Sequence, residues 1–309
     1  MTSSVISPNF SDRSPFLEQQ WDNCSPRCAL KWRQGQLLVN LAENAKNACP
    51  ESFNDERSLV ECLKSSSARL VRIDPDLGEA KLKVWANACQ EAKKPIFLLL
   101  PFTQELPMRR NPLSWGLKRL FDWSVAALLL AVLSPLMLAL TLAIRIFTPG
   151  PIFFCQWRVG KRGKLFRIFK FRTMVVDAEK YHYQVMANQT GLHKCKDDSR
   201  ITPLGRWMRK YSLDELPQLF NVLRGEMSLV GPRPWALYDA VRINKAGQKR
   251  LNALPGITGD WQVKARSHLL DLEAVNHCDL EYLRSWSIWR DLLILPLTML
   301  RVISGFGAY

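Results

Sequence analysis

The longest uncharged apolar stretch of the chain is Trp123–Ile144, which holds twenty-two residues without Asp, Glu, Lys or Arg. This length suffices to cross a bilayer as a helix. Ser134-Pro135 stands at its midpoint, where proline removes a backbone hydrogen bond and a serine hydroxyl can satisfy the carbonyl that proline frees. Basic residues flank both ends, so charge gives no orientation for a crossing. We therefore predict a membrane re-entrant segment, 118–145, that bends at Ser134 and Pro135 and leaves by the face it entered. A buried hairpin of a soluble protein is the alternative.

Short apolar runs and a helical pattern alternate before this segment. Leu70–Asp74 and Pro95–Pro101 are typical of buried strands, and Gly78–Ala92 is typical of a helix. That order predicts a βαβ unit, and the lack of a glycine-rich phosphate loop argues against nucleotide binding there. We expect an accessory N-terminal region over 1–110, containing a small α/β domain behind a polar arm at 1–30. A second domain is expected over 111–309.

The pattern after the apolar segment is mixed. A strand is expected from Ile152, a hairpin over 159–174 with its turn at Gly160–Gly163, and an amphipathic helix at Asp271–Ser287. Further expected elements are helices at Val175–Ala187 and Trp235–Leu254, a short basic helix ending at Tyr211, and a strand at Trp261–Val263. The apolar run Leu292–Val302, interrupted by Pro296 and Arg301, predicts a helix lying at the membrane interface. The fold class is thus α+β: a monotopic membrane protein with a re-entrant helix-break-helix and a small mixed helix/strand catalytic domain, preceded by the small α/β domain.

Charge narrows the choice of partners. The net charge is +15, and Arg158–Arg172 contains seven Lys or Arg and no acidic residue. Such a stretch suits nucleic acid, an anionic membrane surface or a phosphorylated small molecule. A nucleic-acid-binding protein would leave the apolar segment unexplained and shows no recognition motif here. We therefore expect no nucleic-acid partner.

Candidate chemistry concentrates at Ser212–Arg233, where Asp214 and Glu215 are adjacent and Arg233 lies between two prolines. Carboxylates surrounded by cations suit phosphate chemistry, because one carboxylate can attack or hold a metal while cations bind the phosphate oxygens. The structural alternative is a capping box, in which Ser212 and Glu215 close a helix N-terminus.

Several sequence blocks in order resemble the bacterial sugar transferase family of monotopic phosphoglycosyl transferases, the polyprenyl-phosphate glycosyl-1-phosphate transferases. The resemblance runs from Lys118 to Tyr309. The blocks are Lys118-Arg119-x-x-Asp122, Ser134-Pro135, Pro149-Gly-Pro-Ile-Phe-Phe, Gln156-x-Arg-Val-Gly, Lys170-Phe-Arg-Thr-Met, Asp198-x-Arg-Ile-Thr, Ser212-Leu-Asp-Glu-Leu-Pro-Gln, Val230-Gly-Pro-Arg-Pro, Pro255-Gly-Ile-Thr-Gly, Asp279-x-Glu-Tyr and the terminal Gly-Ala-Tyr. Two departures stand out: Asp260 precedes Trp261 where the family often has glycine, and residues 1–117 lack the several transmembrane helices of larger members.

The resemblance implies transfer of sugar-1-phosphate from a UDP-sugar to a membrane polyprenyl phosphate, with release of UMP. It implies that Asp214 is the nucleophile of a phosphosugar-enzyme intermediate and that Glu215 helps to hold Mg²⁺ on the diphosphate. The phosphate-binding candidates that we place around them are Lys170, Arg172, Arg200, Arg206 and Arg233. Such a reaction would be the first membrane step of exopolysaccharide or other glycoconjugate synthesis.

The same resemblance implies the bacterial inner (cytoplasmic) membrane as location, with the catalytic domain on the cytoplasmic face and membrane lipids as partners. A homodimer is compatible with these expectations, and the sequence does not decide the oligomeric state. The rival to an enzyme is a membrane-anchored, non-catalytic regulatory or binding module of the same fold. Loss of Asp214 or Glu215 would have favoured that module, but both acids are present.

Overall fold

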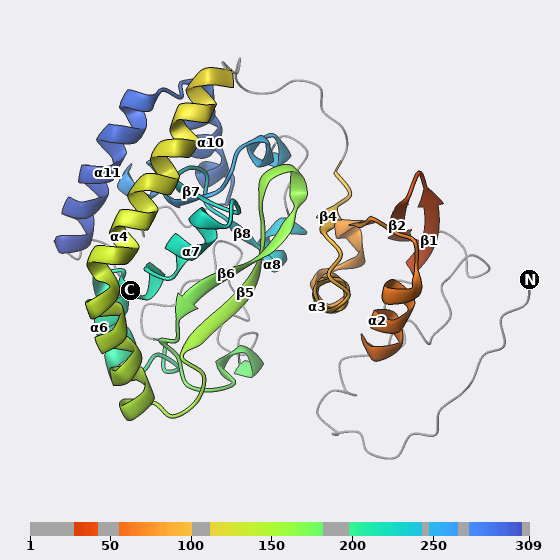
Figure 1. Ribbon diagram of the computed structural model, residues 1–309, viewed down its shortest axis with the longest axis horizontal. Helices are drawn as coiled ribbons and strands as arrows, with labels where there is room; N and C mark the ends of the chain where they lie inside the picture. Colours follow the sequence, from red (N-terminus) through yellow and green to blue (C-terminus); the bar gives the residue numbers. More distant parts are fainter. Residues whose placement is uncertain are drawn as a thin grey trace, which may run out of the picture.

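The computed structural model describes residues 28–42, 56–100, 112–181, 198–242, 247–264 and 272–304 (Figure 1). The expected domain boundary at 110, most of the polar arm and the terminal Gly-Ala-Tyr lie outside these residues. The chain forms an N-terminal unit, residues 28–100, and a C-terminal unit that begins at residue 112.

The N-terminal unit is a four-stranded sheet with the strands in chain order: β1 (Cys28–Arg33), β2 (Gln36–Leu41), β3 (Leu70–Ile73) and β4 (Ile96–Leu98). β1 and β2 are antiparallel, whereas β2, β3 and β4 run parallel. Helix α2 (Glu56–Ser65) connects β2 to β3, and η3 (Pro75–Leu77) with α3 (Glu79–Glu91) connects β3 to β4. The predicted strand–helix–strand order at 70–101 is confirmed. The β1–β2 hairpin and α2 were not foreseen.

Alternating apolar residues explain why this sheet packs on one face. Leu37, Val71 and Ile96 lie side by side across three strands, and Val39, Ile73 and Leu98 form the next row. All six side chains are buried in one core together with α2 and α3 residues. Because successive side chains of a strand point to opposite faces, this period of two selects the face that the helices cover.

The C-terminal unit combines two small sheets with several short helices. An antiparallel sheet has the order β6 (Leu165–Phe171), β5 (Phe153–Val159), β8 (Trp235–Ala236), and η4 (Lys161–Gly163) forms the turn between β5 and β6. A parallel pair joins β7 (Ser228–Val230) to β9 (Gly256–Thr258). The remaining helices are α4 (Pro112–Phe147), η5 (Ala178–Tyr181), α6 (Pro203–Lys210), η6 (Leu213–Glu215), α7 (Gln218–Leu223), α8 (Leu237–Ala240), η7 (Gly247–Asn252), α9 (Asp260–Lys264), α10 (Leu272–Arg284) and α11 (Ile288–Ile303).

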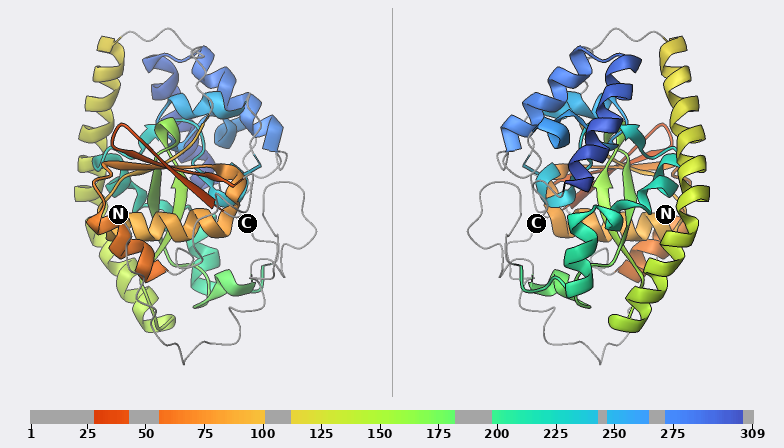
Figure 2. Two further views of the ribbon diagram at one scale, coloured as in Figure 1. Left: turned by 90° about the vertical axis from the view of Figure 1, so that its right-hand side faces the viewer. Right: turned by 90° about the vertical axis from the view of Figure 1, so that its left-hand side faces the viewer.

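The long helix α4 continues through Ser134-Pro135, so the predicted break in the helix is absent, although the helix bends there. It runs for 36 residues with Pro135 inside it, and it changes direction near its middle in both Figure 1 and Figure 2. The hydroxyl of Ser134 donates to the carbonyl of Ala131 at 2.8 Å. Ala131 lies four residues before Pro135, so its carbonyl is the one that proline leaves without a backbone donor. The helix therefore bends without interruption, because the serine replaces the lost hydrogen bond.

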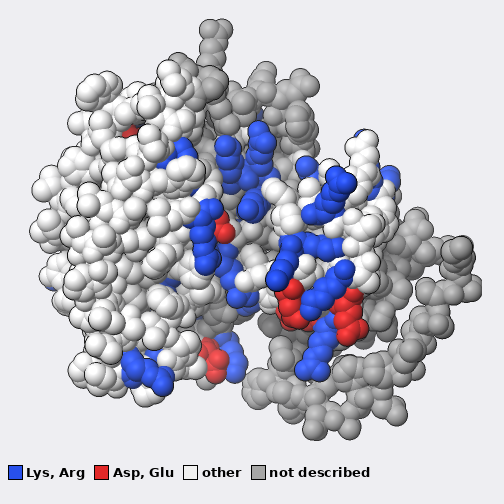
Figure 3. Space-filling model, viewed as in Figure 1, with Lys and Arg blue, Asp and Glu red and all other residues white. Residues whose placement is uncertain are grey.

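Helices α4 and α11 leave much of their apolar surface uncovered. In α4 the sequence window that could cross a membrane has only 17% of its residues buried. Large exposed side chains include Leu128, Val132 and Ile146 on α4 and Trp289 and Ile303 on α11. The space-filling view is almost free of charge over these two helices, on the side away from the N-terminal unit (Figure 3). Large apolar side chains exposed together on neighbouring helices are typical of a surface that binds a membrane or another protein.

Three predicted elements are wrong in type or extent. Trp235–Leu254 is not one helix, because Trp235 and Ala236 pair with Val159 and Arg158 of β5. Trp261–Val263 belongs to helix α9 rather than a strand. Within the described part of Val175–Ala187, the short η5 replaces the predicted helix. Short apolar runs do not separate helix from strand, and pairing with a distant strand decided the first case.

Candidate active site

The two adjacent acids lie on a tight turn between two helices. Thr202 begins α6 by accepting a hydrogen bond from the backbone of Gly205 at 3.0 Å. After α6 ends, Ser212 adopts a left-handed conformation, with φ 51° and ψ 24°, and η6 follows directly. A non-glycine residue in this region is uncommon and costs free energy, and such strain gathers at functional sites. The turn brings Asp214 and Glu215 to the start of α7.

The Ser212 half of the capping box is absent. The side chain of Ser212 makes no capping hydrogen bond to η6. Glu215 instead accepts from Lys170 Nζ of β6 at 2.6 Å. Both partners keep about a quarter of their side-chain surface exposed, 23% for Lys170 and 26% for Glu215. The Glu215 carboxylate therefore lies beside a lysine of β6 and keeps part of its surface in contact with solvent.

Asp214 is in a different state from its neighbour. It is 7% exposed, and no cation in the described ranges forms an ion pair with it. Burial raises the pKa of Asp214, the charge of Lys170 lowers it, and the adjacent Glu215 raises it again. A buried carboxylate without a fixed counter-ion is more basic and less solvated than an aspartate in water, so it is suited to attack an electrophile.

A second cation near Asp214 was not among the predicted residues. Arg209 on α6 donates from Nε to the hydroxyl of Thr173 at 2.8 Å. Its charge and that of Asp214 influence each other, while burial lowers the pKa of Arg209. The sequence does indicate such a cation, because Arg209 and Lys210 end α6 just before the acidic turn.

Arg233 lies on a loop held by backbone contacts. Its guanidinium stacks over the Trp261 ring at 4.6 Å, and its backbone amide donates to Asp279 at 3.4 Å. A Cβ added to Gly231 would come within 2.5 Å of the Leu254 carbonyl, so only glycine allows the two glycine-containing loops to touch there. The blocks beginning at Val230 and Pro255 are therefore one structural unit.

A buried ion pair between Arg250 and Asp279 supports the loop that carries Arg233. Arg250 pairs with Asp279 at 2.5 Å, and both side chains are 1% exposed. Arg250 also donates to the backbone carbonyl of Arg233. Burial raises the pKa of Asp279 to about 6 and lowers that of Arg250 to about 10, while the partner's charge opposes each shift. The buried pair and the hydrogen bond from Arg250 to the Arg233 carbonyl fix the position of the Arg233 backbone.

Arg158 is a second cation that was not among the predicted phosphate-binding residues, although it belongs to the Gln156-x-Arg-Val-Gly block. It donates to the carbonyl of Pro234 at 3.1 Å and to the Gln156 side chain, while its buried Nε has no partner. Burial lowers the pKa of Arg158, Tyr238 opposes that shift, and Arg233 and Glu215 are near enough to influence it. In the described part of the chain no carboxylate forms an ion pair with Arg158. This guanidinium has donors left for an anion.

The other predicted phosphate-binding cations are placed elsewhere. Arg172 donates to the carbonyls of Thr148 and Pro149, at the turn that follows α4. Arg200 pairs with Asp198 at 2.6 Å and donates to the Ala178 carbonyl. Arg206 is exposed on α6. The structure thus brings Lys170 to the acids and Arg233 near Arg158, whereas phosphate binding by Arg172, Arg200 and Arg206 stays a prediction.

A metal at this turn must be one that needs few protein ligands. No group of three or more His, Cys, Asp or Glu side chains gathers within the described residues. Mg²⁺ fits such a site, since it is held by one or two carboxylates, substrate phosphates and water. The partly exposed carboxylate of Glu215 has the chemistry for this role.

Comparison with known proteins identifies the family of the C-terminal unit. A family model described as bacterial sugar transferase matches residues 113–305. The galactosyl transferase CpsE of Streptococcus agalactiae serotype III is 45% identical over 162 residues, 52% of this chain and 36% of that protein. The undecaprenyl-phosphate glucose phosphotransferase of Komagataeibacter xylinus is 42% identical over 230 residues, 70% of this chain and 41% of that protein.

A shorter relative is covered more fully. The UDP-glucose:undecaprenyl-phosphate glucose-1-phosphate transferase of Caulobacter vibrioides is 42% identical over 200 residues, which make up 62% of this chain and 72% of that protein. The chain spans less than half the length of the first two relatives. Because the family model covers more than half of the sequence, the chain belongs to the bacterial sugar transferase family.

Proposed function

We propose that the protein transfers sugar-1-phosphate from a UDP-sugar to a membrane polyprenyl phosphate and releases UMP. The observation that carries this proposal is the buried Asp214 carboxylate, which has no fixed counter-ion and lies beside the Lys170–Glu215 pair. The names of two of the relatives described above include undecaprenyl-phosphate, and one of these names also includes UDP-glucose. The relatives differ in the sugar named, so the sugar is not assigned.

The proposed reaction has two displacements at the same phosphorus. A carboxylate oxygen of Asp214 forms a bond to the β-phosphorus of the donor, and the bond between that phosphorus and the bridging oxygen breaks. UMP leaves with the bonding electron pair. A phosphate oxygen of the polyprenyl phosphate then attacks the same phosphorus and displaces Asp214, which leaves a polyprenyl diphosphate sugar and regenerates the carboxylate.

The surrounding residues have separate proposed tasks. Glu215 would hold Mg²⁺, which when bound would neutralise charge on the diphosphate. Lys170, Arg158 and Arg233 would bind phosphate oxygens, because Lys170 pairs with Glu215, Arg158 is near enough to Glu215 to be influenced by its charge, and Arg233 lies near Arg158. Arg209 would keep Asp214 charged enough to attack.

The acceptor is a lipid, so the proposal requires membrane contact. Lys118 Nζ on α4 pairs with Asp291 on α11 at 2.5 Å, and the Trp115 and Trp286 rings stack at 4.7 Å. These contacts hold α4 close to α11, and both helices expose large apolar side chains. We propose that this face enters the cytoplasmic leaflet of the bacterial inner membrane, with α4 re-entrant at Ser134-Pro135. Cysteine labelling at both ends of the chain in intact cells tests the topology, since a re-entrant helix leaves both ends on one side.

The reaction is tested with purified protein in detergent. The experiment incubates it with undecaprenyl phosphate, Mg²⁺ and a panel of UDP-sugars, and follows UMP release. Donor alone should leave a sugar-phosphate adduct on the peptide containing Asp214, visible by mass spectrometry. UMP formation that needs the lipid and leaves no adduct would replace the covalent route by direct transfer. No UMP with any donor would favour the non-catalytic membrane module.

A further inference from the structure

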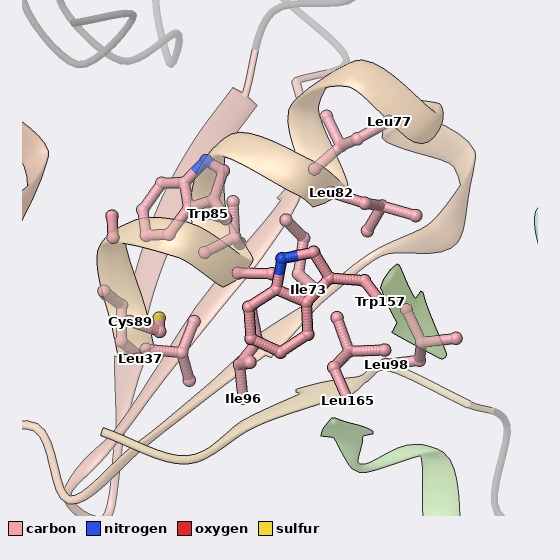
Figure 4. Packing of buried hydrophobic residues seen from close by; sticks show 14 of the residues in the cluster. Leu37, Ile73, Leu77, Leu82, Trp85, Cys89, Ile96, Leu98, Trp157 and Leu165 are labelled. Atoms are coloured by element: carbon pink, nitrogen blue, oxygen red, sulfur yellow. The ribbon is translucent and has the colours of Figure 1, made fainter. Parts of the chain in front are cut away.

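The N-terminal unit shares a hydrophobic core with the sheet that carries Lys170. Trp157, Val159 and Leu165, on β5 and β6, belong to the same buried cluster as residues of α3 and β4. In Figure 4 the Trp157 indole lies among Leu82, Ile96 and Leu98 of the N-terminal unit. A backbone bridge between Phe97 and Lys164 extends the contact to the start of β6. The two units therefore pack as one folded body along this hairpin.

One polar side chain of the N-terminal unit organises the contact. The Oδ1 atom of Asn87, on α3, accepts hydrogen bonds from Trp157 Nε1 at 2.8 Å and from Arg167 Nη2 at 3.0 Å. The guanidinium of Arg167 also lies 5.1 Å from the centre of the Trp157 ring. Removal of Asn87 Oδ1 would leave an indole N–H in a core without its acceptor, which costs free energy. The amide thus joins both strands of the hairpin to α3.

Strand β6 is held from its other face by α7. Phe166 and Ile168 pack with Leu219 and Val222 in a second core. The side chain of Asn221 accepts from the Phe169 backbone amide at 3.0 Å and donates to the Arg167 carbonyl at 2.8 Å. Because side chains alternate along a strand, Leu165 and Arg167 face the N-terminal unit while Phe166, Ile168 and Lys170 face α7 and the acidic turn.

This arrangement connects Asn87 to the catalytic carboxylates through a short stretch of rigid backbone. Arg167 and Lys170 are three residues apart on β6, about 10 Å along the strand. Lys170 then reaches Glu215 at 2.6 Å. A strand that slides or tilts by about 1 Å would break a hydrogen bond of this length.

We propose that Asn87 is a positioning residue for the transfer reaction, through which the N-terminal unit fixes β6 so that Lys170 meets Glu215. The inference rests on the proposed function, and it gives the N-terminal unit a role in turnover. Asn87 does not touch the substrate. It acts through Arg167, Trp157 and the backbone of β6.

The test compares three changes on α3. Asn87→Ala removes the acceptor and should lower kcat about tenfold, because Lys170 is no longer held in place. Asn87→Asp keeps an oxygen acceptor for both donors and should retain activity within about twofold. Gln90→Ala, on the exposed side of the same helix, is the matched control and should behave as wild type.

A functional double-mutant cycle separates positioning from general destabilisation. In a Lys170→Met background, Asn87→Ala should cost less than about twofold, because the residue through which it acts is already gone. Equal fold-losses in the two backgrounds would overturn the proposal, and so would full activity of Asn87→Ala.

A second measurement does not depend on the reaction. Hydrogen exchange of peptides covering 165–171 should be faster in Asn87→Ala than in wild type and in Asn87→Asp. Unchanged exchange would also overturn the proposal. If the wild-type protein releases no UMP at all, the proposed function fails, and the exchange experiment still decides whether Asn87 fixes β6.

Discussion

Two lysine–carboxylate sites in this protein differ in how their charges are satisfied. The first is the helix clamp, formed by Lys118, Asp122, Ser228, Tyr282 and Asp291, which joins α4 to α11 and β7. Asp291 is 4% exposed and accepts from Lys118 at 2.5 Å, Tyr282 at 2.6 Å and Trp286 at 3.0 Å. Asp122 accepts from Ser228 at 2.7 Å and from the Leu229 amide at 3.1 Å.

The second is the acidic turn with Asp214, Glu215 and Lys170. Asp214 is also buried, at 7% exposed, yet no described cation forms an ion pair with it. Glu215 and Lys170 pair with each other while both remain partly exposed. Buried charges in a stable framework are fully paired and hydrogen-bonded, whereas a site that binds a ligand keeps donors and acceptors in reserve. We propose on this difference that the helix clamp holds the fold and that the acidic turn acts on a substrate.

Asp214→Asn should give the largest effect. Asparagine has nearly the same size but is not a nucleophile, so turnover should fall more than about a thousandfold. The melting temperature should stay within about 2 °C of wild type or rise, because a buried unpaired charge is removed. UMP release and thermal melting measure the two quantities. Retained turnover would make Asp214 structural and remove the contrast with the helix clamp.

Asp291→Asn should show the opposite behaviour. It removes the closer carboxylate partner of Lys118 and leaves Asp122, at 4.0 Å, as the remaining one. The free energy of unfolding should therefore fall by less than about 3–5 kcal/mol, which is the cost of losing a sole buried partner. Denaturation in detergent should show this loss, and activity per folded molecule should change less than about threefold. Lys118→Met with Asp291→Leu is the matched double variant, and it should recover much of the stability. A stable Asp291→Asn protein would contradict the clamp.

Arg233→Lys tests a residue outside both sites. Lysine keeps the charge but loses the planar group that stacks on Trp261 and can hold two phosphate oxygens. We expect activity to fall about 10–100-fold, mainly through weaker donor binding, with an unchanged melting profile. Donor KM and kcat should be measured separately. Full activity would demote Arg233 to a support for the loop.

Cys89 shows how burial affects an ionisable side chain, and it can be compared with the buried carboxylates of the two sites. Burial raises the pKa of this thiol to about 12, despite the opposing charge of Lys94. The thiol is fully buried and its raised pKa keeps it protonated, so Cys89 should resist iodoacetamide in the folded protein. The exposed Cys62 should react, and the exposed Cys155, whose pKa burial also raises, should react more slowly than Cys62. Peptide mass spectrometry resolves the sites, and fast labelling of Cys89 would show that the N-terminal core opens readily.

Much of the fold follows from local patterns. The alternation in Leu70–Asp74, the helix at Gly78–Ala92 and the hairpin turning at Gly160–Gly163 are present as predicted. The bend of α4 follows from Ser134-Pro135, because the lost backbone hydrogen bond and its replacement are both local. Whether the segment is re-entrant, and whether the chain divides at residue 110, stay predictions.

The sequence by itself determined where the apolar helix, the acidic turn and the glycine loops lie, because period, charge and backbone freedom are properties of neighbouring residues. Tertiary structure decided which cations surround the acids. Lys170, Arg209 and Arg158 come from three different elements, while Arg172 and Arg200, equally basic in sequence, are taken by Thr148 and Asp198. Tertiary structure also packed the N-terminal unit against β5 and β6. A charge finds its partner within a few ångströms of space, and residues that meet there are often more than forty positions apart along the chain, as Lys170 and Glu215 are.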